Sequence, residues 1–300
     1  MNFANNFIIY LLRFIPKWAV KIIANRYIAG TSINHAIKAI KKINSKNQSA
    51  TLDILGEHTK DIESSSQITN EYIEILRQIQ INKLDCNVSI KPTHIGSDIN
   101  EDTVMNNFKK IQSYAIKTNN FVRLDMESSK ITDLTLNIYK KLMKINGNSG
   151  IVVQAYLYRS ENDIESLPNN INIRLCKGIY NEDESIAIKD QDEINKNYIK
   201  LLSMIFQKNI YVGIATHDKK LIKDCMELIE NQKIPTDKFE FQYLYGVPMN
   251  DMIKLYIENN FKVRAYIPFG LDWYNYSIRR IKENPKIATY IIKNLFKFKV

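Results

Sequence analysis

The chain alternates short apolar runs with longer stretches in which apolar residues recur every three to four positions. Short runs rich in Val, Ile and Phe predict buried strands, and the 3.6-residue period between them predicts amphipathic helices. The predicted strands are Ala50–Leu55, Asn87–Lys91, Phe121–Met126, Gly150–Tyr156, Asn172–Cys176, Tyr211–Ala215, Phe239–Leu244 and Lys262–Ile267. The predicted helices are Thr69–Asn82, Asp102–Thr118, Ile131–Ile145, Asp183–Gln207, Lys219–Asn231 and Met249–Asn260, with a shorter stretch at Asn162–Leu167.

This alternation predicts an α/β protein. Eight strands joined by seven crossovers within about 220 residues are what a (βα)8 barrel needs, and each crossover is long enough for a parallel connection. A doubly wound open sheet is the alternative. No G-x-G-x-x-G follows a strand and no G-x-x-x-x-G-K-[ST] occurs in the chain, so neither a Rossmann cofactor site nor a P-loop is supported. Glycines that could allow tight turns and close ligand approach follow five strands: Gly56, Gly96, Gly178, Gly246 and Gly270.

No low-complexity linker or visible repeat divides the chain. We expect an N-terminal helical segment over residues 1–48, a barrel over residues 49–285 and a C-terminal helical tail over residues 286–300, with a final helix capping the C-terminal face of the barrel. Residues 3–24 show one apolar face beside basic residues, which fits either a helix packed on its own domain or an interfacial membrane helix. The apolar run Phe7–Leu12 is too short to span a bilayer, so we expect no transmembrane segment and no export.

Composition narrows the function classes. Apolar residues make up 45% of 300 residues, and 42 Lys+Arg against 32 Asp+Glu give a net charge of +10. This excludes an acidic disordered chain and raises the question of an anionic partner: nucleic acid, a membrane or a small acidic substrate. Cys86, Cys176 and Cys225 are widely spaced, which favours a reducing cytoplasm over a disulfide framework. No spacing of histidines, cysteines and carboxylates suggests a metal site.

Candidate chemistry gathers at the ends of the predicted strands, where barrel active sites form. A purely structural barrel would need few charges there, because burying them is costly. The polar residues at or just beyond these ends are Glu57, Lys91, Thr93, His94, Asp125, Glu127, Gln154, Tyr156, Arg159, Arg174, Lys177, Tyr180, Thr216, His217, Asp218, Gln242, Tyr245 and Tyr266.

One further group follows the last strand. Its four residues have the spacing i, i+3, i+4, i+7 and would share one helix face: Tyr276, Arg279, Arg280 and Glu283. Adjacent arginines one turn after a tyrosine suit a bound carboxylate or phosphate, and a solvated basic helix end is the alternative.

Nine segments, collinear with the predicted strands, resemble the motifs of the proline dehydrogenase family. They cover roughly residues 26–285 and are Leu52–Glu57, Ser89–Gly96, Arg123–Glu127, Val153–Tyr156, Arg174–Tyr180, Ala215–Asp218, Phe239–Gly246, Arg264–Gly270 and Tyr276–Arg280. The resemblance implies a distorted (βα)8 TIM barrel that binds FAD without a Rossmann domain. It also implies oxidation of L-proline to Δ1-pyrroline-5-carboxylate, with electrons passing to a membrane quinone.

The resemblance also assigns residues by position. It places Lys91, Arg279 and Arg280 on the proline carboxylate, with the rest of the substrate pocket formed by Asp125, Tyr180, Leu244, Tyr266 and Tyr276. It places Gln154 and Arg174 on the isoalloxazine ring of FAD, with the remainder of the cofactor held by Lys177, Gly178, Thr216, His217 and Glu283. No covalent nucleophile is required for this chemistry.

Some positions depart from the usual family pattern: Pro92 replaces leucine, His94 glutamine, Cys176 valine and Asp218 asparagine. Asp218 would add a negative charge near the FAD phosphates. Asn181 and the chain end at Val300 fit the short monofunctional branch, so a separate pyrroline-5-carboxylate dehydrogenase would act next.

Two alternative functions stay open. One is a related barrel flavoenzyme acting on 4-hydroxyproline, and the other is a basic anion-binding or nucleic-acid-binding module. No basic and aromatic stripe supports nucleic-acid binding. We expect a cytoplasmic protein, with peripheral contact at the inner face of the cytoplasmic membrane suggested by residues 3–24 and the quinone acceptor.

Overall fold

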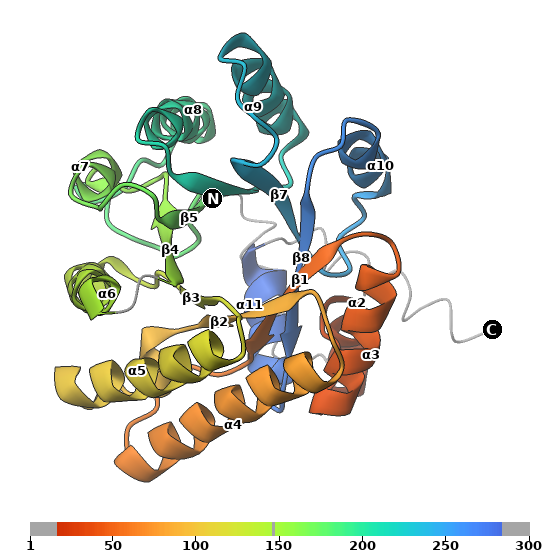
Figure 1. Ribbon diagram of the computed structural model, residues 1–300, viewed down its shortest axis with the longest axis vertical. Coiled ribbons are helices and arrows are strands. Elements are labelled where there is room, and N and C mark those ends of the chain that lie inside the picture. Colours follow the sequence, from red (N-terminus) through yellow and green to blue (C-terminus); the bar gives the residue numbers. More distant parts are fainter. Residues whose placement is uncertain (1–16, 146–147, 284–300) are drawn as a thin grey trace.

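In the computed structural model, which describes residues 17–145 and 148–283, eight parallel strands form a closed barrel (Figure 1). The strands pair in chain order and β8 returns to β1, so the predicted (βα)8 barrel is confirmed and the open sheet is excluded. The strands are β1 (Ser49–Ile54), β2 (Cys86–Ile90), β3 (Val122–Leu124), β4 (Ser149–Gln154), β5 (Asn172–Cys176), β6 (Tyr211–Ala215), β7 (Phe239–Leu244) and β8 (Val263–Phe269).

Helices connect the strands and surround them (Figure 1). They are α4 (Ile62–Ile81), α5 (Glu101–Lys117), α6 (Thr132–Ile145), α7 (Ser160–Glu165), α8 (Gln191–Gln207), α9 (Lys219–Asn231) and α10 (Asn250–Glu258), with 3-10 turns η2 (Pro92–Ile95) and η3 (Ser129–Ile131). The helix predicted at Lys219–Asn231 is confirmed at both ends. The other predicted connecting helices are present with one or both ends shifted; α6 and α8 end at Ile145 and Gln207, as predicted.

Two helix starts differ clearly from the prediction, and each has a local cause. Helix α4 begins at Ile62 rather than Thr69, because the Asp61 side chain accepts a hydrogen bond from Ser64 N and caps the helix earlier. Helix α8 begins at Gln191 rather than Asp183. The residues before it instead pair with the segment after β4, through Tyr158 N–Ile186 O and Ile188 N–Tyr156 O hydrogen bonds.

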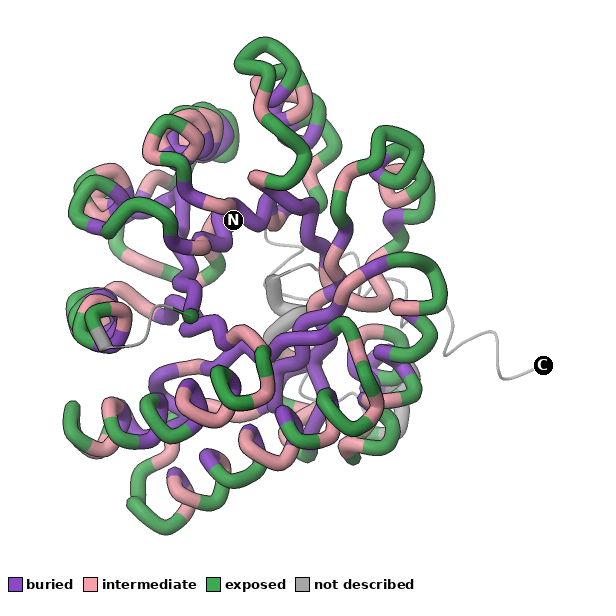
Figure 2. The backbone as a smooth tube through the Cα atoms, in the orientation of Figure 1, coloured by how far each residue is buried: buried purple, intermediate pink, exposed green. Residues whose placement is uncertain are grey.

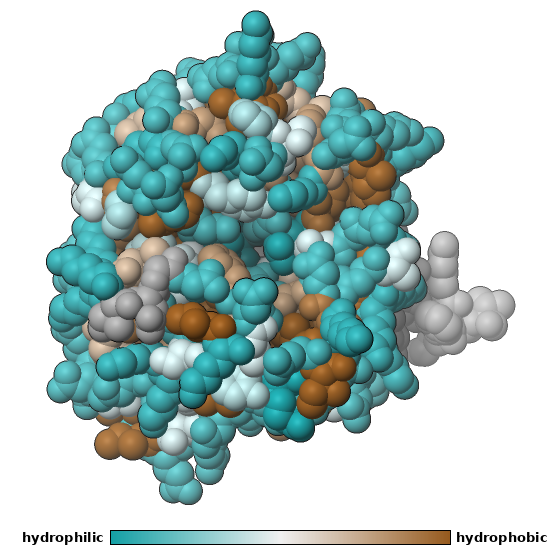
Figure 3. Space-filling view, in the orientation of Figure 1, coloured by the Kyte–Doolittle hydropathy of each residue, from teal (hydrophilic) through white to brown (hydrophobic). Residues whose placement is uncertain are grey.

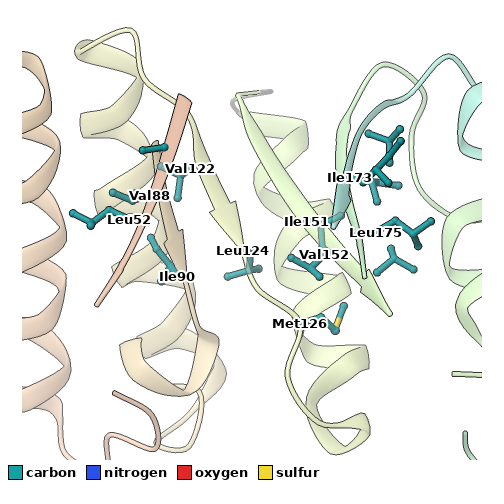
Figure 4. Packing of buried hydrophobic residues seen from close by; sticks show 14 of the residues in the cluster. Leu52, Val88, Ile90, Val122, Leu124, Met126, Ile151, Val152, Ile173 and Leu175 are labelled. Atoms are coloured by element: carbon teal, nitrogen blue, oxygen red, sulfur yellow. The ribbon is translucent and has the colours of Figure 1, made fainter. Parts of the chain in front are cut away.

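The strands separate an outer apolar layer from a polar interior. Apolar strand side chains that point outward pack beneath the helices and form most of one large buried cluster. Figure 2 shows the strands as a ring of buried residues. Figure 4 labels part of this cluster: Leu52, Val88, Ile90, Val122, Leu124, Met126, Ile151, Val152, Ile173 and Leu175. Of these, Met126 and Val152 also line the cavity at the strand ends. Successive strand residues face opposite ways, so many alternate positions place buried polar side chains inside the barrel. These include Thr51, Asp53, Ser89, Arg123, Arg174, Glu240 and Gln242.

Three further helices complete the described chain: α2 (Lys17–Tyr27), α3 (Ile33–Asn44) and α11 (Trp273–Glu283). Helix α3 packs on β1 and β8, and α2 packs against α11, which lies behind the middle of the strand ring in Figure 1. Ala24 and Ile28 of α2 and its following turn contact Leu55 and Tyr276 in a small buried cluster. The final helix therefore covers the end of the barrel where the strands terminate. Within residues 17–145 and 148–283, no helix has the length and apolar character needed to cross a membrane.

Candidate active site

A cavity of about 560 Å³ opens at the carboxyl ends of the strands. Every strand contributes a lining residue. Tyr266 comes from the middle of β8, the other strands contribute from their last positions or from the residue that follows, and α11 contributes Tyr276. The volume lies within the range typical of small-molecule and cofactor sites, roughly 300–1,000 Å³. The position is the one that barrel enzymes use for catalysis.

The first charged pair in the cavity joins β1 to the end of β2. Lys91 Nζ lies 2.8 and 2.7 Å from the two carboxylate oxygens of Asp53. The Lys91 side chain is 12% exposed and that of Asp53 is 1% exposed. Burial alone would lower the pKa of Lys91, but the nearby carboxylates of Asp53 and Asp125 outweigh it and leave the pKa raised. The site thus keeps a lysine cation at its edge.

The second charged pair crosses the barrel. Arg174 Nη1 on β5 donates to Asp125 Oδ1 at 2.9 Å and to Ser89 Oγ at 3.1 Å. Tyr266 OH donates to the other Asp125 oxygen at 3.1 Å, and the Arg174 guanidinium lies 4.9 Å from the centre of the Tyr266 ring. Burial raises the pKa of Tyr266 well above its usual value, so its hydroxyl stays protonated and can donate. The Arg174 Nη2 atom is buried and has no hydrogen-bond partner among the described residues.

Four further hydrogen bonds fix the wall of the cavity. Gln154 Nε2 donates to Glu127 O at 2.9 Å, and the Glu127 carboxylate accepts from Thr93 N and Oγ1 at 2.9 and 2.7 Å. His217 Nε2 accepts a hydrogen bond from Leu244 N at 2.9 Å, which requires a deprotonated Nε2. These contacts join the segments after β2 and β3 to β4, and the segment after β6 to β7.

A third ion pair lies beside the cavity. Lys177, just after β5, places Nζ 2.6 Å from Asp218 Oδ2, and Asp218 in turn caps the start of α9. Gly178 follows with φ 109°, a conformation that a residue with a side chain rarely adopts. A Cβ at this position would lie 2.1 Å from Cδ1 of the Tyr156 ring, so the close packing of this loop also requires glycine.

The structure brings together most of the site residues expected from the sequence. Ten of them line the cavity: Lys91, Asp125, Gln154, Arg174, Tyr180, Thr216, His217, Leu244, Tyr266 and Tyr276. Lys177 and Gly178 lie in the loop that supplies Ile179 and Tyr180 to the cavity, without lining it themselves. The side chains of Arg279, Arg280 and Glu283 lie outside the described part of the structure, although their positions belong to α11.

Asp53 is the main lining residue that was not expected. It sits inside the apolar run of β1, and its partner Lys91 is 38 residues away. A charged residue in the middle of a predicted buried strand was the available signal, because such residues are almost always paired. Cys176 also lines the cavity, but burial raises the pKa of its thiol to about 12, so it is no thiolate nucleophile. Residues 17–145 and 148–283 contain no cluster of histidine, cysteine and carboxylate side chains that could hold a metal.

A closed (βα)8 barrel with paired cations and carboxylates at the strand ends defines the class: a barrel enzyme for a small charged organic substrate. The family model described as proline dehydrogenase matches residues 36–291. This chain therefore belongs to the proline dehydrogenase family, a family of oxidoreductases.

Similar proteins support this placement. Proline dehydrogenase 2 of Bacillus subtilis is 35% identical over 289 residues, covering 96% of this chain and 95% of that protein. Proline dehydrogenase of Deinococcus radiodurans is 33% identical over 281 residues, covering 92% and 90%. Among solved structures, proline utilization A (PutA) from Bdellovibrio bacteriovorus, inactivated by N-propargylglycine, superposes with a TM-score of 0.81 at 25% identity. That match covers 87% of this chain and 32% of PutA, so this chain corresponds to about a third of that protein.

Proposed function

We propose that this chain is an FAD-dependent proline dehydrogenase that oxidises L-proline to Δ1-pyrroline-5-carboxylate. The observation that carries the proposal is the cavity in which the Lys91–Asp53 and Arg174–Asp125 pairs meet at the strand ends. Family membership supplies the reaction class, and the cavity supplies groups suited to a substrate that carries one carboxylate and one ring nitrogen.

In this proposal Lys91 binds the proline carboxylate together with Arg279 and Arg280 of α11. Three cations around one carboxylate orient the substrate and reject uncharged amines. Asp125, Tyr266 and Tyr276 complete and order the pocket, while Leu244 packs on the pyrrolidine ring and Tyr180 lines the cavity. Positive charge develops on the substrate nitrogen as the adjacent carbon is oxidised, and in this proposal the carboxylate of Asp125 would stabilise it.

The residues that line the cavity also fit a flavin. Arg174 lines the cavity and carries a buried Nη2 that lacks a partner among the described residues, which suits the polar edge of an isoalloxazine ring. When bound, FAD would supply the electron acceptor that takes up the hydride from the ring carbon next to nitrogen. Gln154 and Arg174 would contact the ring, and the remainder of FAD would be held by Lys177, Gly178, Thr216, His217 and Glu283.

The wider setting is part of the same proposal. We place a membrane quinone as the final electron acceptor and a separate pyrroline-5-carboxylate dehydrogenase as the next enzyme. Peripheral contact with the inner face of the cytoplasmic membrane would bring the site near the quinone, and the amphipathic pattern of residues 3–24 supports it. The division into segments 1–48, 49–285 and 286–300 assigns catalysis to the middle segment.

One spectrum tests the central claim. The purified protein, supplied with FAD, should show flavin absorbance that bleaches on anaerobic addition of proline. A protein that takes up no FAD, or whose flavin absorbance is unchanged by proline, would overturn the proposal. Faster bleaching with 4-hydroxyproline than with proline would assign the other substrate.

The carboxylate role has its own test. Arg279→Met should raise the KM for proline about tenfold or more, since it removes a charged hydrogen bond, and should leave FAD bound. Arg77→Met, which changes an exposed arginine of α4 paired with Glu74, should leave KM unchanged. Equal KM values in the two variants would refute the carboxylate role of Arg279.

A further inference from the structure

Gln242 on β7 links Arg174 to the base of the barrel. Its Oε1 accepts a hydrogen bond from Arg174 Nε at 2.7 Å, and its Nε2 donates to Glu240 Oε1 at 2.6 Å. The orientation of the amide follows from chemistry, because an arginine can only donate and an ionised carboxylate can only accept. Gln242 is 4% exposed and Glu240 is 2% exposed, so water does not compete for these bonds.

Glu240 is itself held in place from below. Arg264 on β8 donates from Nε to Glu240 Oε1 at 2.7 Å, while its Nη1 donates to Ala50 O at 2.7 Å and to Asn87 Oδ1 at 3.0 Å. Burial would raise the pKa of Glu240, but Arg264, together with Arg123 and the Gln242 hydrogen bond, outweighs burial and the pKa is lowered, so this carboxylate stays ionised. The chain of contacts from Arg264 through Glu240 and Gln242 therefore ends on Arg174 Nε.

The neighbouring strand leaves space for the Gln242 side chain and for little else. Gly213 on β6 lies directly beneath it: a Cβ added to Gly213 would be 2.3 Å from Gln242 Nε2 and 2.8 Å from Cδ. This glycine does not have the left-handed backbone conformation of Gly178, so its requirement here is space rather than φ. The Gln242 amide is thus fixed both by its partners and by packing.

The consequence falls on Arg174. Its Nε bonds to Gln242 and its Nη1 bonds to Ser89 and Asp125, which leaves Nη2, on the cavity-lining side chain, without a described partner. We infer that Gln242 is a positioning residue, which aims Arg174 Nη2 at the bound flavin and so sets how strongly the protein favours reduced flavin. The inference rests on the proposed function and extends it to a residue that touches Arg174 directly.

The test compares Gln242→Leu with Gln48→Leu. Gln48 is a matched control: it is 4% exposed and accepts a 2.6 Å hydrogen bond from Tyr243, the next residue of β7, but does not contact Arg174. Gln242→Leu should keep FAD bound and lower the midpoint potential of the flavin, because the Arg174 cation is no longer held toward the flavin. Flavin reduction by saturating proline in a single turnover should slow about tenfold or more, with little change in the KM for proline. Gln48→Leu should change neither potential nor rate.

Gly213→Ala provides a second variant if Gln242→Leu does not fold. It keeps every hydrogen-bonding group and pushes the Gln242 amide away from its present position, so it should lower the potential in the same direction. A wild-type potential in the variants that fold would overturn the inference, as would a fall of equal size in Gln48→Leu. The potential is measured with a chemical reductant and needs no proline. A wild-type flavin that proline fails to reduce would therefore count against the proposed function alone.

Discussion

At the residue scale, the barrel interior contains charged side chains that lower stability but are suited to chemistry. The interior contains three buried ion pairs: Lys91–Asp53, Arg174–Asp125 and Arg264–Glu240. Aliphatic side chains at these positions would give a higher free energy of unfolding, because they carry no charge to desolvate. Losing one partner of such a pair would leave an uncompensated buried charge, at a cost of about 3–5 kcal/mol. Such an arrangement is expected where a site needs permanent charge more than packing.

His94 is a buried group whose ionisation links stability to pH. It is 5% exposed, and its Nδ1 is buried with no hydrogen-bond partner among the described residues. Burial, together with the nearby Lys91 cation, lowers its pKa from 6.5 to about 3. Below about pH 6.5, His94 therefore binds a proton in the unfolded chain but stays neutral in the folded protein. The free energy of unfolding must fall as the pH drops from 6.5 towards 3.

We predict that His94→Gln flattens this dependence. Between about pH 7 and pH 5 the wild-type protein should lose about 2 kcal/mol of unfolding free energy through His94, and the variant should lack that loss. Urea unfolding at the two pH values measures it. His35→Gln, at an exposed position, serves as the control and should keep the wild-type dependence. Equal pH dependence in both variants would show that His94 ionises freely in the folded protein.

At the element scale, sequence periodicity predicted all eight strands and the helices between them, because each strand is an apolar run whose outer face is buried under helices. It failed where polar side chains decide the geometry. The start of α8 is set by the Asp190 cap and by the pairing of residues near Ala187. The acidic residues before Asp190 resemble those common in the first turn of a helix, so the sequence pattern predicted an earlier start. Contacts such as Gly213 with Gln242 join adjacent strands through space, so no local pattern in the sequence reveals them.

Helix starts also bear on cofactor binding. Asp218 accepts from Lys220 N at 3.0 Å and Leu221 N at 3.3 Å, and its other oxygen is held by Lys177. Burial would raise the pKa of Asp218, but bonds from Lys177 and Asn195 outweigh it and lower the pKa to about 2. Asp218 is therefore negatively charged and pairs with Lys177. It competes with FAD for this lysine, which we propose contacts the cofactor.

We predict that Asp218→Asn binds FAD about two- to fivefold more tightly, the equivalent of one partly exposed ion pair released to the cofactor. Asparagine keeps an oxygen for the helix cap, so stability should change little. Asp190→Asn makes the same change at the start of α8, where Asp190 accepts from Asp192 N and Glu193 N, and should leave FAD affinity unchanged. Titration of the apoprotein with FAD, followed by flavin fluorescence, measures both. Weaker binding by Asp218→Asn would mean that Asp218 serves to hold Lys177 for the cofactor.

At the scale of the whole molecule, the basic surplus separates into two populations. Hydrophilic side chains cover most of the face seen in Figure 3, with hydrophobic ones in separate patches. Of the 42 basic residues, 33 are lysines, and many lie on exposed helix faces. Exposed ion pairs there, such as Lys196–Glu193 and Lys220–Asp192, contribute little to the stability of the fold. The buried cations Lys91 and Arg174 instead face the cavity. The net charge alone therefore says little about function, whereas the placement of these few cations says much.

The whole-molecule arrangement also ties the N-terminal helices to the site. The turn after α2 is joined to β8 by the Ala29 N–Pro268 O hydrogen bond at 2.9 Å, and to the residue that follows β8 by Gly270 N–Gly30 O at 3.0 Å. Ala24 and Ile28 bury Tyr276, whose side chain lines the cavity. Because α11 carries Tyr276 and the positions of Arg279 and Arg280, the placement of the proposed carboxylate site depends on residues 17–30.

Two truncations separate this packing role from membrane binding. Removing residues 1–28 deletes Ala24 and Ile28, exposes Leu55 and leaves α11 without its partner helix, so the KM for proline should rise about tenfold or more while FAD stays bound. Removing residues 1–16 spares every contact described for α2, so KM should stay at the wild-type value. Steady-state kinetics and sedimentation with anionic vesicles should be measured on both. If the shorter truncation loses vesicle binding at unchanged KM, the membrane contact belongs to residues 1–16. An unchanged KM after removal of residues 1–28 would show that α11 holds its position on the barrel without α2.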